Sequence, residues 1–355
     1  MKNTDIEALL LDANRRFPLW QPQDAVKLLY QRVYGCEHFV SGEEKSLRYL
    51  QQEWAALPAS PAPPSLWEPL GGGWGRLNLA AVDPARLPLP LLNRMFCLSS
   101  VQAAGSPEEL EEALQQLEAL GARDLLAFSS EALSAFLAEY RRQGCPSLHH
   151  SEDYRRAYRP AYRVLREEWL AVLPLLPLLT QRLQEQPFLT AALDGPAASG
   201  KTTLARLLAR LYDAPVVHMD DFFLPSGLRT PQRLAEPGGN IDYERFSREV
   251  VPGLQTNCPF SYRRYSCARD VLEPEPCPVP AAPLRIVEGS YSLHPRWQAC
   301  WGLKIFLTVP AAVQEERILR RNGAEGLALF RERWIPLENQ YFSFFQIPSL
   351  ADIIL

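Results

Sequence analysis

The chain has 355 residues, of which 47% are hydrophobic and 22% charged, and its formal net charge at pH 7 is −4. This length exceeds one typical domain core and predicts two domains, and the hydrophobic content is ample to bury both. A mildly acidic chain without a long basic run is typical neither of nucleic-acid-binding proteins nor of proteins that bind anionic membranes, so we expect neither partner.

The cysteines and the N-terminal segment favour a reducing compartment. The seven cysteines are odd in number and form no C-x-x-C pair, so neither a disulfide framework nor a zinc site is indicated. Residues 1–17 contain early acids and lack the apolar core of a secretion signal. The most apolar stretch, 169–183, contains Pro174 and Pro177 and is shorter than the roughly 20 residues that span a bilayer. We expect a cytoplasmic protein in which 169–183 is a buried, kinked helix.

The first half of the chain is mainly helical by its pattern. Residues 106–120 begin with Ser106 and Pro107 and carry Glu109 three positions after the serine, which is the signature of a capped helix start. Further helices are predicted over 129–142, starting from Ser130, and from 151 through 168. We therefore predict a mainly helical N-terminal domain of unknown role over residues 1–186.

Two Pro-rich passages, 57–75 and 272–284, are predicted to be loops. The N-terminal domain also carries side chains that suit a metal, in two clusters: Glu37 with His38, and His149, His150, Glu152 and Asp153. Their spacing matches no recognised ligand pattern, and His149 to Ser151 are equally typical of a loop and cap before a helix. Both interpretations stay open.

From residue 187 the pattern changes to short apolar runs that alternate with helices. The predicted strands are 188–193, 214–219, 284–287, 303–309 and 351–355. Such alternation predicts an α/β domain over 187–355, with a parallel sheet flanked by helices on both faces. Because ligands of such sheets bind beyond the carboxyl ends of the strands, the residues that follow each run matter most.

The run GPAASGKTT at 195–203 follows the first of these strands and precedes a predicted helix over 204–212. It matches the phosphate-binding pattern G-x-x-x-x-G-K-[ST], in which glycines let the backbone N–H groups surround a phosphate. In this pattern Lys201 reaches the outer phosphates and the Thr202 hydroxyl holds Mg²⁺. The expected nucleotide-binding residues in this phosphate loop are Gly195, Ala198, Ser199, Gly200, Lys201, Thr202 and Thr203.

Carboxylates follow the next two strands: Asp220 and Asp221 after 214–219, and Glu288 after 284–287. Phosphoryl transfer to an alcohol requires Mg²⁺ near the phosphates and a carboxylate that orients the hydroxyl and accepts its proton. Two separate acids suit these two tasks. The sequence alone allows the roles of Asp220 and Glu288 to be exchanged, and either acid would also suit a helix cap.

Three arginines, Arg317, Arg320 and Arg321, lie at helical spacing after the fourth strand. Guanidinium groups there would close over the phosphates and stabilise charge in the transition state. The alternative is a solvated basic helix face.

Residues 187–355 resemble the uridine kinase and phosphoribulokinase-like group of P-loop kinases, and more closely the uridine kinase-like proteins of bacteria. The N-terminal domain carries no such resemblance. The motifs that carry it occur in the family's order: GPAASGKTT, HMDDFFLP, GGNIDYERF, FSYRRYSCAR, RIVEGSYSLHP and RILRRNG.

The resemblance implies ATP and Mg²⁺ as cofactors and a role for each matching residue. By resemblance Asp220 is the base, Glu288 lies near Mg²⁺ beside Thr202, and the three arginines belong to a lid over ATP. The resemblance also implies that the substrate pocket contains Asp221, Phe222, Asp242, which would grip sugar hydroxyls, Tyr262, Arg264 and Arg269.

The chain departs from uridine kinases between Tyr262 and Arg269. Where those enzymes place an aspartate directly after the tyrosine and a histidine two residues before the arginine, this chain has Arg263 and Cys267. Arg263 and Arg264 would suit a substrate that carries a phosphate or carboxylate.

These observations predict an ATP-dependent kinase that phosphorylates a hydroxyl of a nucleoside, a sugar derivative or a related metabolite. The N-terminal domain would then regulate, recognise the substrate or form a homodimer. Two alternatives remain: a nucleotide switch or sensor that signals to the N-terminal domain, and a bifunctional enzyme with separate chemistry in that domain.

Overall fold

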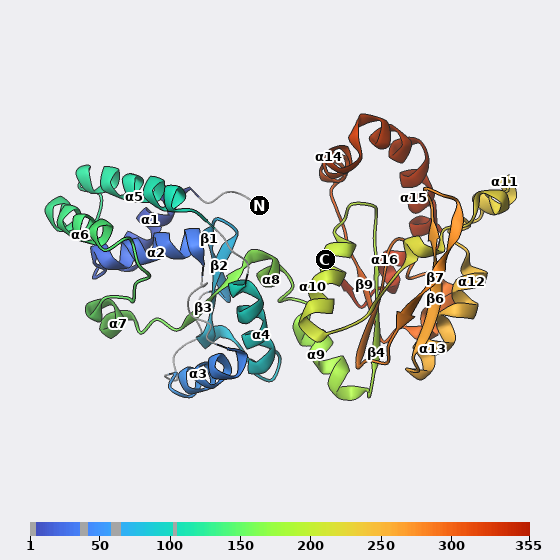
Figure 1. Ribbon diagram of the computed structural model, residues 1–355, viewed down its shortest axis with the longest axis horizontal. Helices are drawn as coiled ribbons and strands as arrows, with labels where there is room; N and C mark the ends of the chain where they lie inside the picture. The colour runs from blue at the N-terminus through green and yellow to red at the C-terminus, as the bar shows by residue number, and fades with distance from the viewer. Residues whose placement is uncertain (1–4, 36–41, 58–64, 102–104) are drawn as a thin grey trace. The chain divides into compact units, whose positions relative to one another are not determined.

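The computed structural model describes residues 5–35, 42–57, 65–101 and 105–355. The chain divides into two compact units, Met1–Leu176 and Pro177–Leu355 (Figure 1). The boundary therefore falls after residue 176, where the sequence analysis had placed it after residue 186.

The first unit is mainly helical, and its helix starts follow local capping rules. Ser106 caps its helix through the Glu109 N–H, while Glu109 accepts from the Ser106 N–H, so this predicted start is confirmed. The helix predicted from Ser130 begins there, with Ser129 as its cap. The helices are α1 (Ile6–Arg16), α2 (Pro22–Tyr34), α3 (Glu43–Ala55), α4 (Leu89–Ser100), α5 (Pro107–Ala122), α6 (Ser130–Arg142), α7 (Glu152–Tyr158) and α8 (Glu167–Ala171).

An antiparallel sheet, absent from the sequence analysis, joins segments far apart in the first unit. Its order is β1 (Trp67–Gly71), β2 (Trp74–Asn78) and β3 (Tyr162–Arg166). The predicted loop over 57–75 is thus wrong from residue 67 onward, and its residues 58–64 lie outside the described part of the chain. The helix predicted from 151 through 168 is also wrong over residues 159–166, because Pro160 cannot continue it and YRVLR favours an extended strand; residues 167 and 168 belong to a separate helix, α8.

The stretch 169–183 also differs from its prediction. It is split between α8 and a separate helix, α9 (Leu176–Glu185), rather than forming one kinked helix. Pro174 lies in the break, where its missing N–H costs no helical hydrogen bond. The expected burial holds for Trp169, Leu175 and Leu179, all fully buried.

The second unit is built on a five-stranded parallel sheet, so the predicted α/β class is confirmed. All five predicted strands are present, in the order β10 (Ile353–Ile354), β9 (Leu303–Phe306), β4 (Leu189–Asp194), β8 (Leu284–Glu288) and β5 (Val216–His218). The central strand β4 and its neighbour β8 are buried along their whole length, as expected for strands covered on both faces.

Helices cover this sheet. α10 (Lys201–Tyr212) contacts β4, β5 and β8. Ala192, Val217, Val287 and Phe306, from four different strands, belong to a buried cluster with side chains of α12, α13, α15 and α16. The remaining helices and short turns are α11 (Pro231–Ala235), α12 (Tyr243–Glu249), α13 (Val251–Thr256), α14 (Ala311–Leu329), α15 (Ile335–Phe344), α16 (Ile347–Leu350), η2 (Met219–Phe222), η3 (Ser226–Leu228), η4 (Pro295–Cys300) and η5 (Phe330–Trp334).

A two-stranded antiparallel hairpin, β6 (Phe260–Ser266) and β7 (Val271–Val279), forms a separate sheet of the second unit. The loop predicted over 272–284 is therefore wrong up to residue 279. Proline normally interrupts a strand, because it has no N–H to donate. Pro276 and Pro278 lie two residues apart on β7, at positions where a backbone N–H would point away from β6, so no hydrogen bond between the two strands is lost. A ribbon with two outer edges accepts this pattern.

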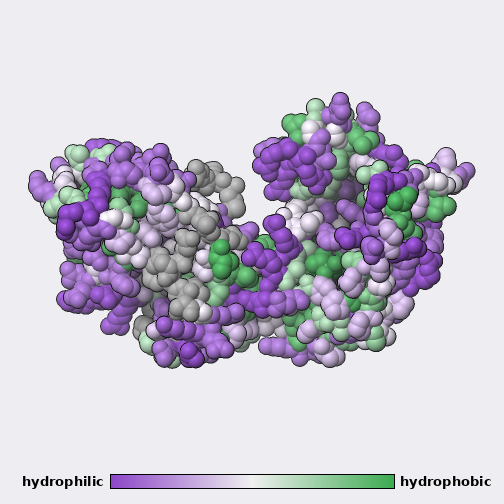
Figure 2. Space-filling view, in the orientation of Figure 1, coloured by the Kyte–Doolittle hydropathy of each residue, from purple (hydrophilic) through white to green (hydrophobic). Residues whose placement is uncertain are grey.

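Hydrophilic residues predominate over hydrophobic ones on the visible face of both units (Figure 2). Within the described residues, no helix combines the length and the apolar character that crossing a bilayer requires.

Candidate functional site

The phosphate loop connects the end of β4 to the start of α10, as the sequence analysis predicted. Gly200 precedes the first residue of α10, so the N-terminal N–H groups of this helix lie at the loop. Gly195 has φ +142°, and a Cβ at this position would lie 2.3 Å from the Leu307 carbonyl oxygen. Only glycine allows this close approach.

The Lys201 side chain folds back onto the loop and is buried. Its ammonium donates to the carbonyl oxygens of Gly195 at 2.8 Å and Pro196 at 2.9 Å. Two of the three donors of the ammonium therefore bind carbonyl oxygens of the loop itself.

Thr202 and Glu288 lie together, as predicted. The Thr202 hydroxyl is 3.2 Å from both Glu288 carboxylate oxygens, and His218 Nδ1 is 2.6 Å from Glu288 Oε1. This contact raises the pKa of His218, chiefly through the hydrogen bond to Glu288. A hydroxyl beside a carboxylate is an oxygen set that suits Mg²⁺, whose remaining ligands in such sites are water and phosphate oxygens.

Asp220 and Asp221 follow β5 within η2, close to this group. The Asp220 side chain is exposed, so its carboxylate contacts solvent. Desolvation and the charge of Glu288 raise the pKa of Asp220, and Lys201 opposes them. A carboxylate with a raised pKa near a phosphate-binding lysine suits proton abstraction from a hydroxyl.

Asp221 is tied to the hairpin. The Tyr262 hydroxyl donates to Asp221 Oδ2 at 2.8 Å, and the positive charge of Arg264 acts on the same carboxylate. Cys267, in the turn of the hairpin, lies within the electrostatic reach of Asp220 and Asp221. Arg269 was also predicted to line the substrate pocket, but its side chain is exposed and pairs with Glu273 of its own hairpin.

Two further predicted substrate residues have structural partners. Asp242 caps α12 by accepting from the Arg245 N–H at 3.0 Å, and its own N–H donates to the Phe222 carbonyl at 2.7 Å. The Phe222 ring is fully buried and packs between Phe246 and Tyr262. Phe222 therefore supports the site from the core rather than facing a ligand.

The predicted lid arginines lie on α14 and are exposed. Arg317 donates to the Ala198 carbonyl at 2.9 Å, which places it at the phosphate loop. Arg321 instead contacts the neighbouring Asn322 and the Phe330 ring. Gly323, with φ +73°, breaks the helical geometry within α14, so the segment that carries Arg320 and Arg321 bends there.

The sequence analysis missed a buried aspartate at the end of β4. Asp194 accepts hydrogen bonds from the N–H groups of Gly195, Tyr291 and Leu293 and from the Tyr341 hydroxyl. It joins the phosphate loop to the segment after β8 and to α15. Complete burial raises the pKa of Asp194 to about 6. Its only sequence signal is its place directly before Gly195.

Glu338 of α15 was also missed, because it lies far along the chain from every motif. It is buried, and its Oε2 accepts from the Ala197 N–H of the phosphate loop at 2.9 Å. Gln314 of α14 donates to the Ala197 carbonyl at 3.0 Å. Ala197 of the loop is thus held by α15 through its N–H and by α14, which carries the lid arginines, through its carbonyl.

In the first unit, His150 belongs to a buried polar group. Its Nδ1 is 2.8 Å from Asp24 and its Nε2 is 2.6 Å from the Tyr162 hydroxyl, while Ser151 caps α7. Burial lowers the pKa of His150 to about 4. Among the described residues no three His, Cys, Asp or Glu side chains are arranged to hold a metal, and Glu37 and His38 lie outside that part of the chain.

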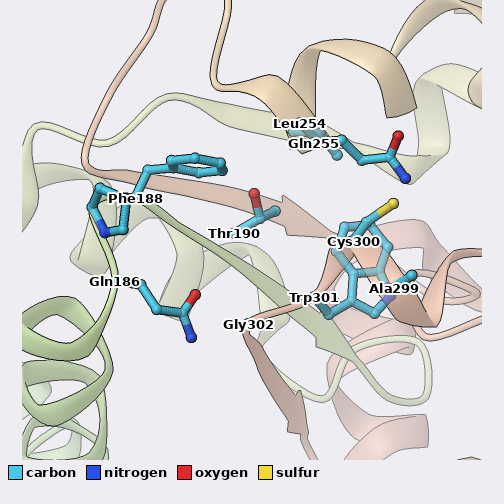
Figure 3. Close-up of a pocket in the computed structure, with 10 residues that line it drawn as sticks. Gln186, Phe188, Thr190, Leu254, Gln255, Ala299, Cys300, Trp301 and Gly302 are labelled. Atoms are coloured by element: carbon cyan, nitrogen blue, oxygen red, sulfur yellow. The ribbon is translucent and has the colours of Figure 1, made fainter.

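A cavity of about 400 Å³ lies at the other end of the strands, where β4 and β9 begin (Figure 3). Phe188 and Thr190 line it at the start of β4, and Cys300 and Trp301 line it just before β9. The phosphate loop follows the other end of β4, so this cavity does not belong to the candidate site.

No protein-family model matches the chain, and no curated protein matches it. Among solved structures, a candidate fructose transport system kinase from Silicibacter sp. is 29% identical with a TM-score of 0.40, over 47% of this chain and 93% of that chain. A candidate uridine kinase from Bacillus stearothermophilus is 18% identical with a TM-score of 0.38, over 50% of this chain and 99% of that chain. Both TM-scores are low, so the likeness by itself assigns neither an activity nor a substrate to this chain.

Proposed function

We propose that the second unit is an ATP-dependent, Mg²⁺-dependent kinase that phosphorylates a hydroxyl group of a small molecule. The observation that carries the proposal is the convergence of three strand ends. The phosphate loop follows β4, Asp220 follows β5 and Glu288 ends β8, and the charges of Lys201, Asp220 and Glu288 act on one another. These are the groups that phosphoryl transfer to an alcohol requires.

In this proposal each group has one task. The N–H groups of the loop and of the first turn of α10 bind the phosphates, and Lys201 turns from its loop carbonyls to the outer phosphates. Thr202 and Glu288 hold Mg²⁺, which neutralises charge between the outer phosphates. His218 orients the Glu288 carboxylate through its hydrogen bond.

Asp220 accepts the proton of the attacking hydroxyl in this scheme. Its raised pKa makes it a better base than a solvated aspartate, and its contact with solvent leaves room for an acceptor. Asp221, fixed by Tyr262, lies beside it and binds the acceptor. Arg317 holds the loop, and Arg320 and Arg321 stabilise charge on the transferred group when the lid closes.

The acceptor class we propose is a nucleoside, a sugar derivative or a related metabolite. Arg264 acts on the Asp221 carboxylate and is exposed, so it would bind an acidic group on the acceptor. Asp242 retains a half-buried carboxylate for hydroxyl groups, although it also caps α12.

The test is ATP consumption by the full chain with Mg²⁺ against a panel of nucleosides, pentoses, phosphorylated sugars and hydroxy acids. We expect turnover that depends on one acceptor class and that falls at least about 100-fold in Asp220→Asn, as general-base catalysis typically contributes that much. Asp213→Asn is the matched control, because Asp213 lies in the left-handed conformation that asparagine accepts.

Slow ATP hydrolysis that no acceptor accelerates and that Asp220→Asn leaves unchanged would contradict the kinase. That outcome would favour a nucleotide switch, in which the first unit responds to occupancy of the second.

A further inference from the structure

Glu338 is a buried carboxylate that none of the tasks above requires. Its two oxygens have different partners: Oε2 accepts from the Ala197 N–H at 2.9 Å, and Oε1 lies 2.6 Å from the Ser290 hydroxyl. Burying a charged carboxylate costs several kcal/mol unless it is well paired. The site therefore keeps Glu338 beneath the phosphate loop at a cost that a neutral side chain would avoid.

Ser290 is the link between Glu338 and the loop. Its Oγ lies 3.0 Å from the Gly195 carbonyl oxygen as well as 2.6 Å from Glu338 Oε1. Both of these atoms accept hydrogen bonds when Glu338 is ionised, and a serine hydroxyl has one proton to donate. Ser290 can therefore satisfy only one of them at a time.

The position of Lys201 determines whether the Ser290 hydroxyl donates to Glu338 or to the Gly195 carbonyl. With Lys201 donating to the Gly195 carbonyl at 2.8 Å, that oxygen has a strong donor, and the Ser290 proton is available to Glu338. When Lys201 turns to a phosphate, the buried Gly195 oxygen loses its charged donor. Leaving a buried carbonyl unsatisfied is unfavourable, and the Ser290 hydroxyl already lies 3.0 Å from this oxygen.

If Ser290 donates to Gly195, the lone pairs of its hydroxyl face Glu338 Oε1. Two acceptors at 2.6 Å repel each other unless a proton lies between them. The arrangement is restored when Glu338 carries that proton and donates it to Ser290. The hydrogen-bond chain then runs from Glu338 through Ser290 to Gly195.

We propose that Glu338 is a positioning residue of the phosphate loop, which takes up a proton from solvent when Lys201 turns to a bound nucleotide and so passes the Ser290 hydrogen bond to Gly195. This inference rests on the proposed nucleotide binding by the second unit. In this proposal α15, which carries Glu338, keeps the conformation of the phosphate loop after Lys201 has turned to the nucleotide.

The charges around Glu338 favour this direction. Burial raises the pKa of Glu338, Lys201 opposes the increase, and the negative charge of Asp220 adds to it; the Tyr291 phenol also faces the carboxylate. Its hydrogen-bond partners, the Ala197 N–H and the Ser290 hydroxyl, are neutral. Departure of the lysine and arrival of phosphate both make an ionised Glu338 less favourable.

The test measures protons bound with the nucleotide. Calorimetric titration of the full chain with ADP, without metal, in buffers of different ionisation enthalpy gives the number of protons taken up. Glu338→Gln is the decisive variant, because its amide oxygen still accepts from Ala197 and its amide nitrogen donates to Ser290 without titrating. We expect native protein to take up more protons than this variant, by at most one per ADP, and ADP affinity to lose part of its pH dependence in the variant.

Two controls isolate Glu338. Glu332→Gln changes an exposed glutamate of the neighbouring η5 segment and should retain the native proton uptake. Asp220→Asn removes a carboxylate whose charge acts on Glu338, and it should retain a difference in proton uptake between Glu338 and glutamine. If Glu338→Gln does not fold, Ser290→Ala replaces it, since loss of the link also removes the need for the proton.

Equal proton uptake by native protein and Glu338→Gln, with ADP bound by both, would overturn this inference and leave the proposed function intact. Absence of ADP binding by the native protein would overturn the proposed function and this inference with it.

Discussion

Tyr262 of the hairpin donates its hydroxyl proton to Asp221, at 2.8 Å, and thereby fixes one of the two carboxylates that follow β5. Tyr262 is buried, and the burial beside Asp221 raises the pKa of its phenol, so it stays protonated and remains a donor. The hairpin and the end of β5 are joined through this bond. In the proposed function, the hairpin thus sets the position of the acceptor.

The first prediction concerns this bond. In Tyr262→Phe the Asp221 carboxylate loses its donor, and we expect KM for the acceptor to rise about tenfold with little change in KM for ATP. A hydrogen bond to a charged group contributes about 1.5–3 kcal/mol, of which solvent returns part. Steady-state kinetics measures both constants. Tyr265→Phe is the control, because Tyr265 is buried on the same strand but donates to Asp270. Equal effects of the two variants would contradict the assignment.

The second prediction concerns Gly195. Its φ of +142° and the closeness of the Leu307 carbonyl leave no room for a Cβ. We expect Gly195→Ala to lose about 1–3 kcal/mol of unfolding free energy and most of its nucleotide affinity, since strain of this kind costs that much. Chemical denaturation and nucleotide titration measure the two effects. Gly227→Ala, where a Cβ meets no atom within 4 Å, should change neither.

The third prediction concerns pH and Asp194. Its pKa of about 6 in the folded chain lies above the ordinary value of 3.8, so the folded protein binds this proton more tightly than the unfolded one. Asp194 therefore contributes stability that is fully present below about pH 4 and is lost as the pH rises through about 6. The total loss corresponds to about 3 kcal/mol.

Asp194→Asn cannot titrate and should lack this part of the pH dependence, although the amide loses some acceptor capacity and lowers stability overall. Denaturation of both proteins from pH 4 to 8 measures the slopes. Parallel slopes would show that Asp194 is not responsible. Asp352→Asn is the control, because this carboxylate is only partly buried beside Lys304.

The fourth prediction concerns the lid. In Arg317→Ala the Ala198 carbonyl loses its guanidinium donor, and we expect ATP affinity to fall about threefold to tenfold, in line with about 0.5–1.5 kcal/mol for one exposed hydrogen bond. Nucleotide titration measures the change. Arg331→Ala should leave ATP affinity unchanged, because Arg331 pairs with Glu315 on the surface.

The sequence predicted what local rules determine. Short β-rich runs, a capped helix start and a phosphate-binding pattern each depend on residues within a few positions. The five strands and the helix from Pro107 were therefore found. The proximity of Thr202 to Glu288, 86 residues along the chain, was expected from the resemblance and not from a local rule.

What the sequence did not predict depends on distant partners. β3 is a strand because it pairs with β2, far away along the chain, which no local pattern reports. β1 and β2, in contrast, are joined by a short turn at Gly72 and Gly73, a local hairpin signal that the prediction of a loop overlooked. Asp194 and Glu338 become site residues only when α15 packs against the phosphate loop. Prolines suggested a loop at β7 because their tolerance in a strand depends on which edge faces the partner. Likewise, the sequence did not show that the Phe222 ring is buried in the core or that Arg269 pairs with Glu273.

The alternating prolines of β7 have a consequence for the protein in a crowded solution. A hairpin with two free edges is a template for strand addition by another chain, and such edges promote aggregation. Pro276 and Pro278 remove N–H donors along the outer edge of β7, and most of this strand is exposed. The second unit can therefore expose a long ribbon to solvent beside the proposed acceptor site, while a neighbouring molecule finds no continuous row of hydrogen-bond donors along its outer edge.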